Sequence, residues 1–214
     1  KQANNHLTFL YLNDCKLKIR DKTMFNDLKC LKYLDLSKVE LDDQVLPDLF
    51  SELKQLISLT MNGTRFKPAE NAFIYLDNLK ELKIESIEIP EECSNILAPL
   101  KSLQRLEMGS TRTFNYEAFR QLKNLRDIRL NHYSTIEIDA NFFDQHPNLE
   151  SLDLSRLNLH DNRSESKTNW IDLRALANLK SLKFLVLCDN KLKLDQDYEI
   201  FSLENLLHLD LSLI

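Results

Sequence analysis

The feature that most constrains this chain is a leucine pattern, LxxLxL, that recurs nine times in register. Examples are LKYLDL at 31–36, LKELKI at 79–84 and LLHLDL at 206–211. Successive motifs start 22 to 25 residues apart, except for one interval of 33. In a chain of 214 residues with 43 leucines one match would be chance, but nine in register indicate a repeat protein. The motifs start at Leu7, Leu31, Leu56, Leu79, Leu103, Leu125, Leu149, Leu182 and Leu206.

Side-chain alternation predicts what each repeat folds into. The last two leucines of the motif are two residues apart, so on a strand they point to the same face. One coil cannot bury that face, whereas stacked coils close a continuous core. We therefore predict an α/β fold: a leucine-rich-repeat solenoid with a concave parallel β-sheet and short helices or turns on the convex side. Five phenylalanines, each six residues before a motif, are expected to pack the convex limb against the strands: Phe25, Phe50, Phe73, Phe119 and Phe143.

The solenoid is expected to be irregular. Many leucine-rich repeats place an asparagine shortly after the strand, where its amide bonds to neighbouring backbone, but here only Asn190 fills that position. The seventh repeat is 33 residues long, and the polar segment 161–170 (DNRSESKTNW) supplies the extra length and should bulge into solvent. Helical turns are expected on the convex limbs at 90–100 and 116–122. In the first of these, Pro90 followed by two glutamates suits a helix start.

The repeats predict the domain organisation. Residues 1–214 are expected to form a single leucine-rich-repeat array of about nine repeats, with the insertion at 161–170. The chain begins at Lys1 rather than Met, and neither end carries a cysteine-rich cap. An uncapped solenoid would expose core leucines to water. We therefore expect the chain to be a fragment of a longer protein.

The composition argues against several classes of function. Two glycines leave no phosphate-binding loop, and the five histidines lie in different repeats, where we expect them on the surface. A net charge of −5 without a run of Lys and Arg argues against nucleic acid, and no apolar stretch is long enough for a membrane helix. We predict no enzyme activity, no cofactor, no metal, no nucleic-acid partner and no membrane contact from this segment. The cysteines are not at metal-ligand spacing: Cys15, Cys30, Cys93 and Cys188.

The residues that alternate with the buried leucines are predicted to form three columns on the concave face, where we expect other proteins to bind. The first repeats present exposed aromatic rings together, which are typical interface anchors. The middle repeats present mixed charge, which suits the steering of a polar partner. The alternative is that these columns are only solvated strand faces. The predicted binding residues are Phe9, Tyr11, Tyr33, Asp35, Lys83, Arg105, Glu107, Asp127, Arg129, Asp153 and Phe184.

Several segments resemble one family of intracellular leucine-rich proteins. They are LTFLYLNDCKL at 7–17, LDLSKVELDD at 34–43, and LDLSRLNL at 152–159, which an extended repeat and LKSLKFLVL at 179–187 follow. These segments are similar to the Zyg-eleven and Zer substrate receptors of cullin–Elongin ubiquitin ligases. The resemblance implies a substrate-recognition adaptor in ubiquitin transfer, with Elongin, cullin and a substrate as partners through flanking regions. It assigns a functional role to no residue of 1–214.

The compartment has two interpretations. Scattered single cysteines favour a reducing environment, and we therefore predict a cytoplasmic protein. The alternative is the ectodomain of an extracellular Toll-like or other innate-immune receptor. The phenylalanine-containing repeats and two glycosylation sequons, Asn62-Gly-Thr and Asn162-Arg-Ser, favour this alternative. A glycan on Asn62 would crowd the concave face.

Overall fold

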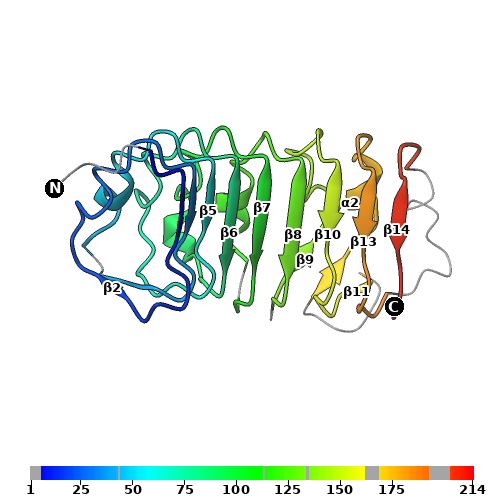
Figure 1. The fold of residues 1–214 in the computed structure, drawn as a ribbon. Coiled ribbons are helices and arrows are strands. Elements are labelled where there is room, and N and C mark those ends of the chain that lie inside the picture. Colours follow the sequence, from blue (N-terminus) through cyan, green and yellow to red (C-terminus); the bar gives the residue numbers. More distant parts are fainter. Residues whose placement is uncertain (1–5, 43, 113, 134, 162–168, 193–202) are drawn as a thin grey trace.

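The computed structural model describes residues 6–42, 44–112, 114–133, 135–161, 169–192 and 203–214. Each repeat contributes one strand to a nine-stranded parallel sheet, and neighbouring strands follow one another along the chain (Figure 1). The predicted solenoid with a parallel sheet is confirmed. Its strands are β1 (Phe9–Tyr11), β3 (Tyr33–Asp35), β5 (Ser58–Thr60), β6 (Glu81–Glu85), β7 (Arg105–Gly109), β8 (Asp127–Asn131), β10 (Ser151–Asp153), β13 (Phe184–Val186) and β14 (His208–Asp210).

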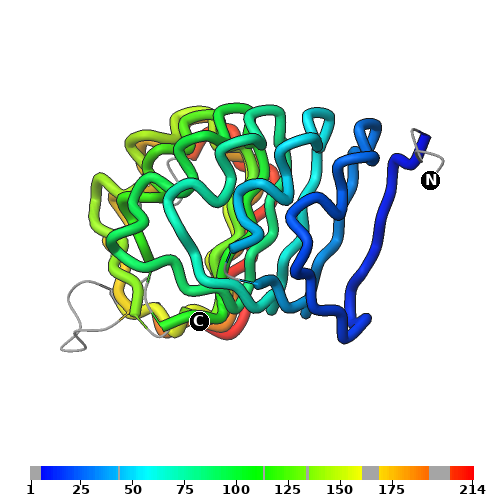
Figure 2. Tube along the Cα trace, turned by 90° about the vertical axis from the view of Figure 1, so that its left-hand side faces the viewer, coloured from blue at the N-terminus to red at the C-terminus, as the bar shows by residue number. Residues whose placement is uncertain are grey.

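The register of this sheet has no offset between repeats. Leu10 pairs with Leu34 and Leu34 with Leu59, and the same step continues to the pair of Leu185 and Leu209. A slip of one residue would turn every leucine of a strand out to solvent, so the buried face fixes the register. In Figure 2 the coils follow one another in chain order from the N-terminal coils (blue) at the right to the later coils (green and yellow) at the left.

Outside the main sheet, the described residues form only short elements. Helix α1 (Tyr116–Phe119) lies in the predicted segment 116–122 and begins at Asn115, whose Oδ1 accepts a hydrogen bond from the Ala118 amide at 3.0 Å. In the predicted segment 90–100 the regular part is a 3-10 helix, η2 (Glu91–Cys93), preceded by Pro90. The remaining elements are η1 (Asp48–Phe50), α2 (Arg174–Ala177), β2 (Lys18–Ile19), β4 (Glu40–Leu41), β9 (Glu137–Ile138), β11 (His160–Asp161) and β12 (Trp170–Ile171).

One hydrophobic core runs through the whole solenoid. The strand leucines in its middle, such as Leu82 and Leu152, are completely buried, and the five convex phenylalanines are at most 1% exposed, as predicted. Burial of each such side chain stabilises the fold by roughly 1.5–3 kcal/mol. Leu10 and Leu209, on the two edge strands, are only partly buried. An edge strand has a neighbour on one side only, which explains the difference.

The position after the strands shows the predicted shortage of asparagine. Asn190 donates hydrogen bonds to the carbonyls of Leu154 and Leu187 at 2.9 and 2.8 Å. In an earlier repeat Thr64 takes over this role, and its hydroxyl donates to the Leu36 carbonyl at 2.7 Å. Buried apolar side chains fill the same position in four other repeats: Val39, Ile87, Tyr133 and Leu157.

A second asparagine ladder, which the sequence interpretation missed, lies in the loops before the strands. Its asparagines directly precede the first leucine of a motif, and each amide donates to a carbonyl in the loop of the preceding repeat. The bonds join Asn78 to Lys54 at 3.1 Å, Asn124 to Lys101 at 2.7 Å, and Asn205 to Lys180 at 2.7 Å. The available signal was the repeated Asn-Leu dipeptide. These bonds satisfy loop carbonyls that the sheet does not reach.

His146 lies in the core, so the expectation that all five histidines are on the surface was wrong. It is 0% exposed and packs against Phe119, with ring centroids 4.4 Å apart. It occupies the loop position that holds a leucine, such as Leu122, in seven of the other eight repeats. Within the described residues neither ring nitrogen has a hydrogen-bond partner. Burial lowers the pKa of His146 to about 4. The polar backbone of Phe119 raises this pKa, but by less than burial lowers it.

The long seventh repeat adds a small second sheet. Strand β12 pairs in parallel with both β11 and β9. Asn169, which directly precedes β12, is buried, and its Oδ1 accepts a hydrogen bond from the Ile136 amide at 2.8 Å. Residues 162–168 of the predicted bulge, including the sequon at Asn162, lie outside the described residues.

Candidate binding surface

The concave face carries the predicted columns in the predicted order. The strand register places Glu81, Arg105 and Asp127 side by side in the first column, and Lys83, Glu107 and Arg129 in the second. All eleven predicted binding residues belong to these two columns. They do not form one cluster, because the sheet distributes them over both of its ends and its middle. Their role in binding stays a prediction.

The first end of the sheet carries an aromatic patch made of Phe9, Tyr11 and Tyr33. The Phe9 and Tyr33 rings are stacked, with centroids 4.4 Å apart and planes 3° from parallel. Phe9 is 50% exposed and Tyr11 is 62% exposed. Large rigid rings that are exposed together can bury apolar area against a partner at a low cost in side-chain entropy.

The middle of the sheet carries a charge ladder made of Glu81, Lys83, Arg105, Glu107, Asp127 and Arg129. Opposite charges alternate across the strands and pair with one another. Arg105 contacts Asp127 at 3.0 Å and Glu81 at 3.6 Å, and Lys83 contacts Glu107 at 3.3 Å. Hydrogen bonds and attraction from Asp127 and Glu81 raise the pKa of Arg105, although burial alone acts in the opposite direction. Because the pairs neutralise one another, this region exerts a weaker field on a distant partner than its number of charges suggests.

Asp35 and Asp153, two of the predicted binding residues, are the last residues of their strands and hydrogen-bond to the turn that follows. Asp35 accepts a hydrogen bond from the Ser37 amide at 2.8 Å, and Asp153 accepts one from the Ser155 amide at 3.0 Å. Asp210 makes the same contact in the last repeat. The sequence signal is LDLS, which occurs at 34–37, 152–155 and 209–212. These carboxylates therefore have a local structural role as Asx turns, whatever else they contact.

The other end of the sheet carries a smaller aromatic surface. Phe184 is 46% exposed, and its ring centroid lies 6.3 Å from that of His208. Phe9 and Phe184 belong to the same column but are separated by most of the sheet. A partner that contacts both would have to extend along the concave face.

The third column of the concave face includes a row of hydrogen-bonded polar residues: Asn62, Glu85 and Asn131. The Asn62 Oδ1 accepts the Glu85 amide at 2.9 Å, and the Asn131 amide donates to the Glu85 carboxylate at 3.2 Å. Gly109 lies between Glu85 and Asn131 in the register. A Cβ on Gly109 would lie 2.2 Å from the Asn131 carbonyl oxygen, so only glycine allows these strands to approach this closely.

Many basic residues lie in the loops that lead into the strands of the main sheet. In Figure 1 the strands begin at the top. They occupy two loop positions in each repeat, two residues before and one residue after the first leucine of the motif. In the eight repeats from Leu31 onward these positions hold nine basic and three acidic residues. We call the basic set the basic rim: Lys29, Lys32, Lys54, Lys80, Lys101, Lys123, Arg126, Lys180 and Lys183. No contiguous run of Lys and Arg marks the basic rim in the sequence, because its members are spread over successive repeats.

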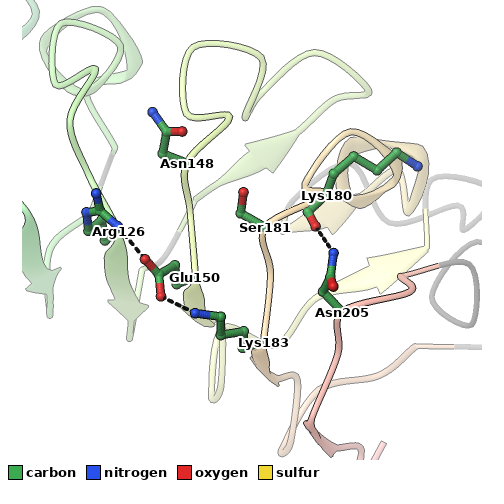
Figure 3. A pocket seen from close by; sticks show the side chains of 7 residues that line it. All are labelled: Arg126, Asn148, Glu150, Lys180, Ser181, Lys183 and Asn205. Carbon is green, nitrogen blue, oxygen red and sulfur yellow. Dashed lines mark hydrogen bonds and ion pairs between the residues drawn. The ribbon is translucent and has the colours of Figure 1, made fainter.

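A shallow pocket of about 310 Å³ opens near the C-terminal end of the basic rim (Figure 3). Glu150 lies between Arg126 and Lys183, at 2.5 and 2.7 Å. Hydrogen bonds from Lys183 and Arg126 lower the pKa of the Glu150 carboxyl. Asn148 and Ser181 also line the pocket. Glu150 thus neutralises the rim locally, and its negative charge makes this pocket a poor site for a small anion.

The described residues contain no other arrangement that points to chemistry. They include no group of three or more His, Cys, Asp or Glu side chains placed to hold a metal ion. No helix in this part of the chain is long and apolar enough to cross a membrane. The four cysteines are free, and Cys93 is buried, where burial raises the pKa of its thiol.

No known protein family matches the sequence, and no curated protein matches it. Solved structures do match. TLR13 in the TLR13–ssRNA13 complex is 25% identical, with a TM-score of 0.72 over 96% of this chain and 28% of that one. An internalin (InlF) from Listeria monocytogenes is 21% identical, with a TM-score of 0.69 over 98% of this chain and 56% of that one. The Arabidopsis receptor kinase HAESA is 18% identical, with a TM-score of 0.67 over 98% of this chain and 34% of that one.

These similarities decide the fold. The chain has the leucine-rich-repeat fold. It spans less than two thirds of the length of each of these three proteins. The internalin and the receptor kinase, at 21% and 18% identity, are evidence of shared architecture alone.

Proposed function

We propose that this chain is a protein-binding scaffold that holds a partner protein along its concave face. The observation that supports this most strongly is the exposed aromatic patch at the first end of the sheet, with Phe184 as a second anchor on the same face. The paired charges between them favour a partner that reproduces their alternation over one that carries a single sign of charge. HAESA, with the same architecture, was solved in complex with a peptide hormone and a co-receptor.

More specifically, we propose a cytoplasmic substrate-recognition adaptor of a cullin–RING ubiquitin ligase. The family resemblance of the repeats motivates it, and Elongin and cullin would bind through flanking regions. Four free cysteines are consistent with a reducing compartment. The sequon at Asn62 also has an explanation that needs no glycan. The Asn62 side chain bonds to Glu85, Gly63 has a φ of +64°, and the Thr64 hydroxyl bonds to Leu36.

The second candidate is the ectodomain of an extracellular innate-immune receptor. The similarity to TLR13, at 25% identity over 96% of this chain, favours it. In this candidate the sequons could carry glycans, and a glycan on Asn62 would break its contact with Glu85 or cover the neighbouring columns. It also predicts cysteine-rich caps in the full-length protein.

Affinity purification of the full-length native protein, followed by mass spectrometry, separates the two candidates. Elongin and a cullin in the eluate, with four unmodified thiols, would support the adaptor. Secretory chaperones and a glycan on Asn62 or Asn162 would instead support the receptor.

Concave-face variants test the scaffold itself. The double substitution Phe9→Ala and Tyr33→Ala should lower recovery of the specific partner at least tenfold, because such anchors contribute about 2 kcal/mol or more each. Ile74→Ala is the matched control, since Ile74 is equally exposed at 50% but lies outside the sheet. Equal loss of the partner in both variants would contradict binding through the concave face.

A further inference from the structure

We propose that the basic rim is a docking surface for an acidic segment of the partner protein. This inference rests on the proposed scaffold function and adds a second contact surface, at the edge of the sheet. The loop positions of the rim recur every 22 to 33 residues along the chain, and only the stacking of the coils brings the nine basic residues into a row.

Backbone hydrogen bonds link the loop positions of the rim from repeat to repeat, although the seventh repeat holds Pro147 and Glu150 there instead of a basic residue. The amide of Lys80 donates to Ile57, that of Gln104 donates to Lys80, and that of Arg126 donates to Gln104, each at 2.8 or 2.9 Å. Neighbouring strands are about 4.8 Å apart, so the six steps from Lys32 to Lys183 span about 30 Å. An extended peptide covers about 3.3 Å per residue, and a segment of about nine residues therefore matches this length.

The charges in the first two thirds of the rim are available. Lys32, Lys80, Lys101 and Lys123 are exposed and form no ion pair with any residue that the structure describes. Lys54 also has no carboxylate partner in that part of the chain, and its ammonium lies 4.5 Å from the centre of the Tyr75 ring. Among the described residues the rim forms ion pairs near its two ends, where Lys29 lies 3.7 Å from Glu52 and where Arg126 and Lys183 contact Glu150. Asp77 is an acidic residue at one of the loop positions of the rim, between Lys54 and Lys80.

The rim is positive although the whole chain is not. The net charge of the chain is −5, so the residues outside the rim are strongly negative in sum. A long polyanion would meet that negative surface wherever it left the rim, whereas a short acidic segment contacts the rim alone. Exposed like charges in a row also attract an acidic partner over about one Debye length, roughly 10 Å at 0.1 M salt.

The same surface is poorly suited to single-stranded nucleic acid. Proteins that bind such strands without sequence preference combine basic residues with aromatic rings on which bases stack. The described part of the rim offers Tyr75, and Lys54 already covers the face of that ring. The exposed rings Phe9, Tyr11 and Phe184 lie on the concave columns. An acidic protein segment needs no stacking surface.

Binding of defined probes to the full-length protein tests the proposal. The probes are a fluorescent peptide of nine alternating Glu and Ser residues, a Ser-Gly peptide of equal length, and a nine-nucleotide poly-uridine strand, compared by fluorescence anisotropy at 50 and 300 mM NaCl. We expect the acidic peptide to bind more tightly than either control, and its affinity to fall at least fivefold between the two salt concentrations.

Charge-reversal variants locate the site. In the rim variant Lys54, Lys80 and Lys101 are changed to Glu, and in the matched control Lys16, Lys67 and Lys191 are changed to Glu. The control lysines are also exposed and form no ion pair with described residues, but they follow the strands instead of preceding them. The rim variant should bind the acidic peptide at least tenfold more weakly, and the control should bind it within about twofold of the unmodified protein.

Three outcomes would overturn the proposal. They are equal weakening in both variants, tighter binding of poly-uridine than of the acidic peptide, and no binding of the acidic peptide at 50 mM NaCl. The purified partner distinguishes this failure from failure of the scaffold. If Phe9→Ala with Tyr33→Ala abolishes partner binding and the rim variant does not, the scaffold function stands and the acidic docking site is rejected.

Discussion

The charge ladder on the concave face and the basic rim at its edge are built from the same kinds of residue and behave differently. In the ladder, Arg105 lies between Glu81 and Asp127 on the two neighbouring strands, so most of its charge is satisfied within the sheet. In the rim, the neighbours of Lys80 in the adjacent repeats are the uncharged residues Ile57 and Gln104, and no described carboxylate pairs with Lys80. Whether a charge stabilises the fold or attracts a partner is thus decided by the residue one repeat away. The ladder is expected to contribute to folding as well as to the choice of partner, and the rim to recognition alone.

The largest expected effect comes from the tight strand contact beside the ladder. Gly109→Ala places a Cβ 2.2 Å from the Asn131 carbonyl oxygen, and the backbone must move to relieve it. We expect the free energy of unfolding to fall by about 3 kcal/mol, which is at the upper end of the cost of overpacking. Urea denaturation measures this change.

Ser102→Ala, in a loop of the rim, is the matched control for that comparison. It should change the free energy of unfolding by less than about 0.5 kcal/mol. Equal effects of the two substitutions would mean that the concave face is no more tightly constrained than its edge.

The second prediction concerns the core beneath the rim. His146 is neutral when folded, because its lowered pKa of about 4 lies below the value of about 6.5 expected in the unfolded chain. The unfolded state therefore binds more protons as the pH falls from about 6.5 towards 4, and stability is lost in that window. Between pH 7 and pH 5 the loss attributable to His146 is about 2 kcal/mol.

His146→Leu supplies the control for the pH effect, since leucine is the residue found at this position in other repeats. The substituted protein should lose about 2 kcal/mol less than the unmodified protein between pH 7 and pH 5. The measurement is urea denaturation at both pH values. An unchanged pH dependence would show that His146 is not the group that titrates.

The smallest expected effect on the free energy of unfolding compares one substitution in the charge ladder with one in the basic rim. Asp127→Asn removes the carboxylate that Arg105 contacts at 3.0 Å, and should lower the free energy of unfolding by about 1 kcal/mol at 50 mM NaCl. Lys80→Gln in the rim should change it by less than about 0.3 kcal/mol, because no described carboxylate partner is lost. Thermal or urea unfolding of both variants measures the difference.

Salt provides the second arm of that test. At 0.5 M NaCl the effect of Asp127→Asn should shrink, because screening weakens partly exposed pairs. A larger loss of stability from Lys80→Gln than from Asp127→Asn would reverse the proposed roles of the two regions.

The sequence was most informative where the period of the repeat alone decides the outcome. Leu34, Leu82 and Leu152 lie at equal positions in their motifs, and all three are buried on one face of the sheet. The order of the three concave columns followed from the same alternation. The convex phenylalanines were predicted for the same reason, because a fixed spacing in a stacked coil fixes the side on which a residue lies.

The sequence was less informative about burial and pairing of polar side chains, because these depend on which residues are neighbours in space. His146 was predicted on the surface because the histidines lie in different repeats without a metal-ligand partner. Its loop position, however, is one that leucines occupy in the core, and the structure buries it. The predicted steering role of Arg105 and Asp127 did not account for their pairing across adjacent strands. The asparagines of the loop ladder act through carbonyl groups in the preceding repeat, which the stacking of the coils brings within hydrogen-bond distance.

The sequence by itself determined the solenoid, the number and register of its strands, and the residues that face the concave side. Those properties depend on the repeat period and on the alternation of apolar side chains, which are local. The tertiary structure decided which charges are neutralised, which lysines form a row, and which histidine is buried. Each of these depends on the identity of residues 22 to 33 positions away, which only the stacking of the coils brings into contact.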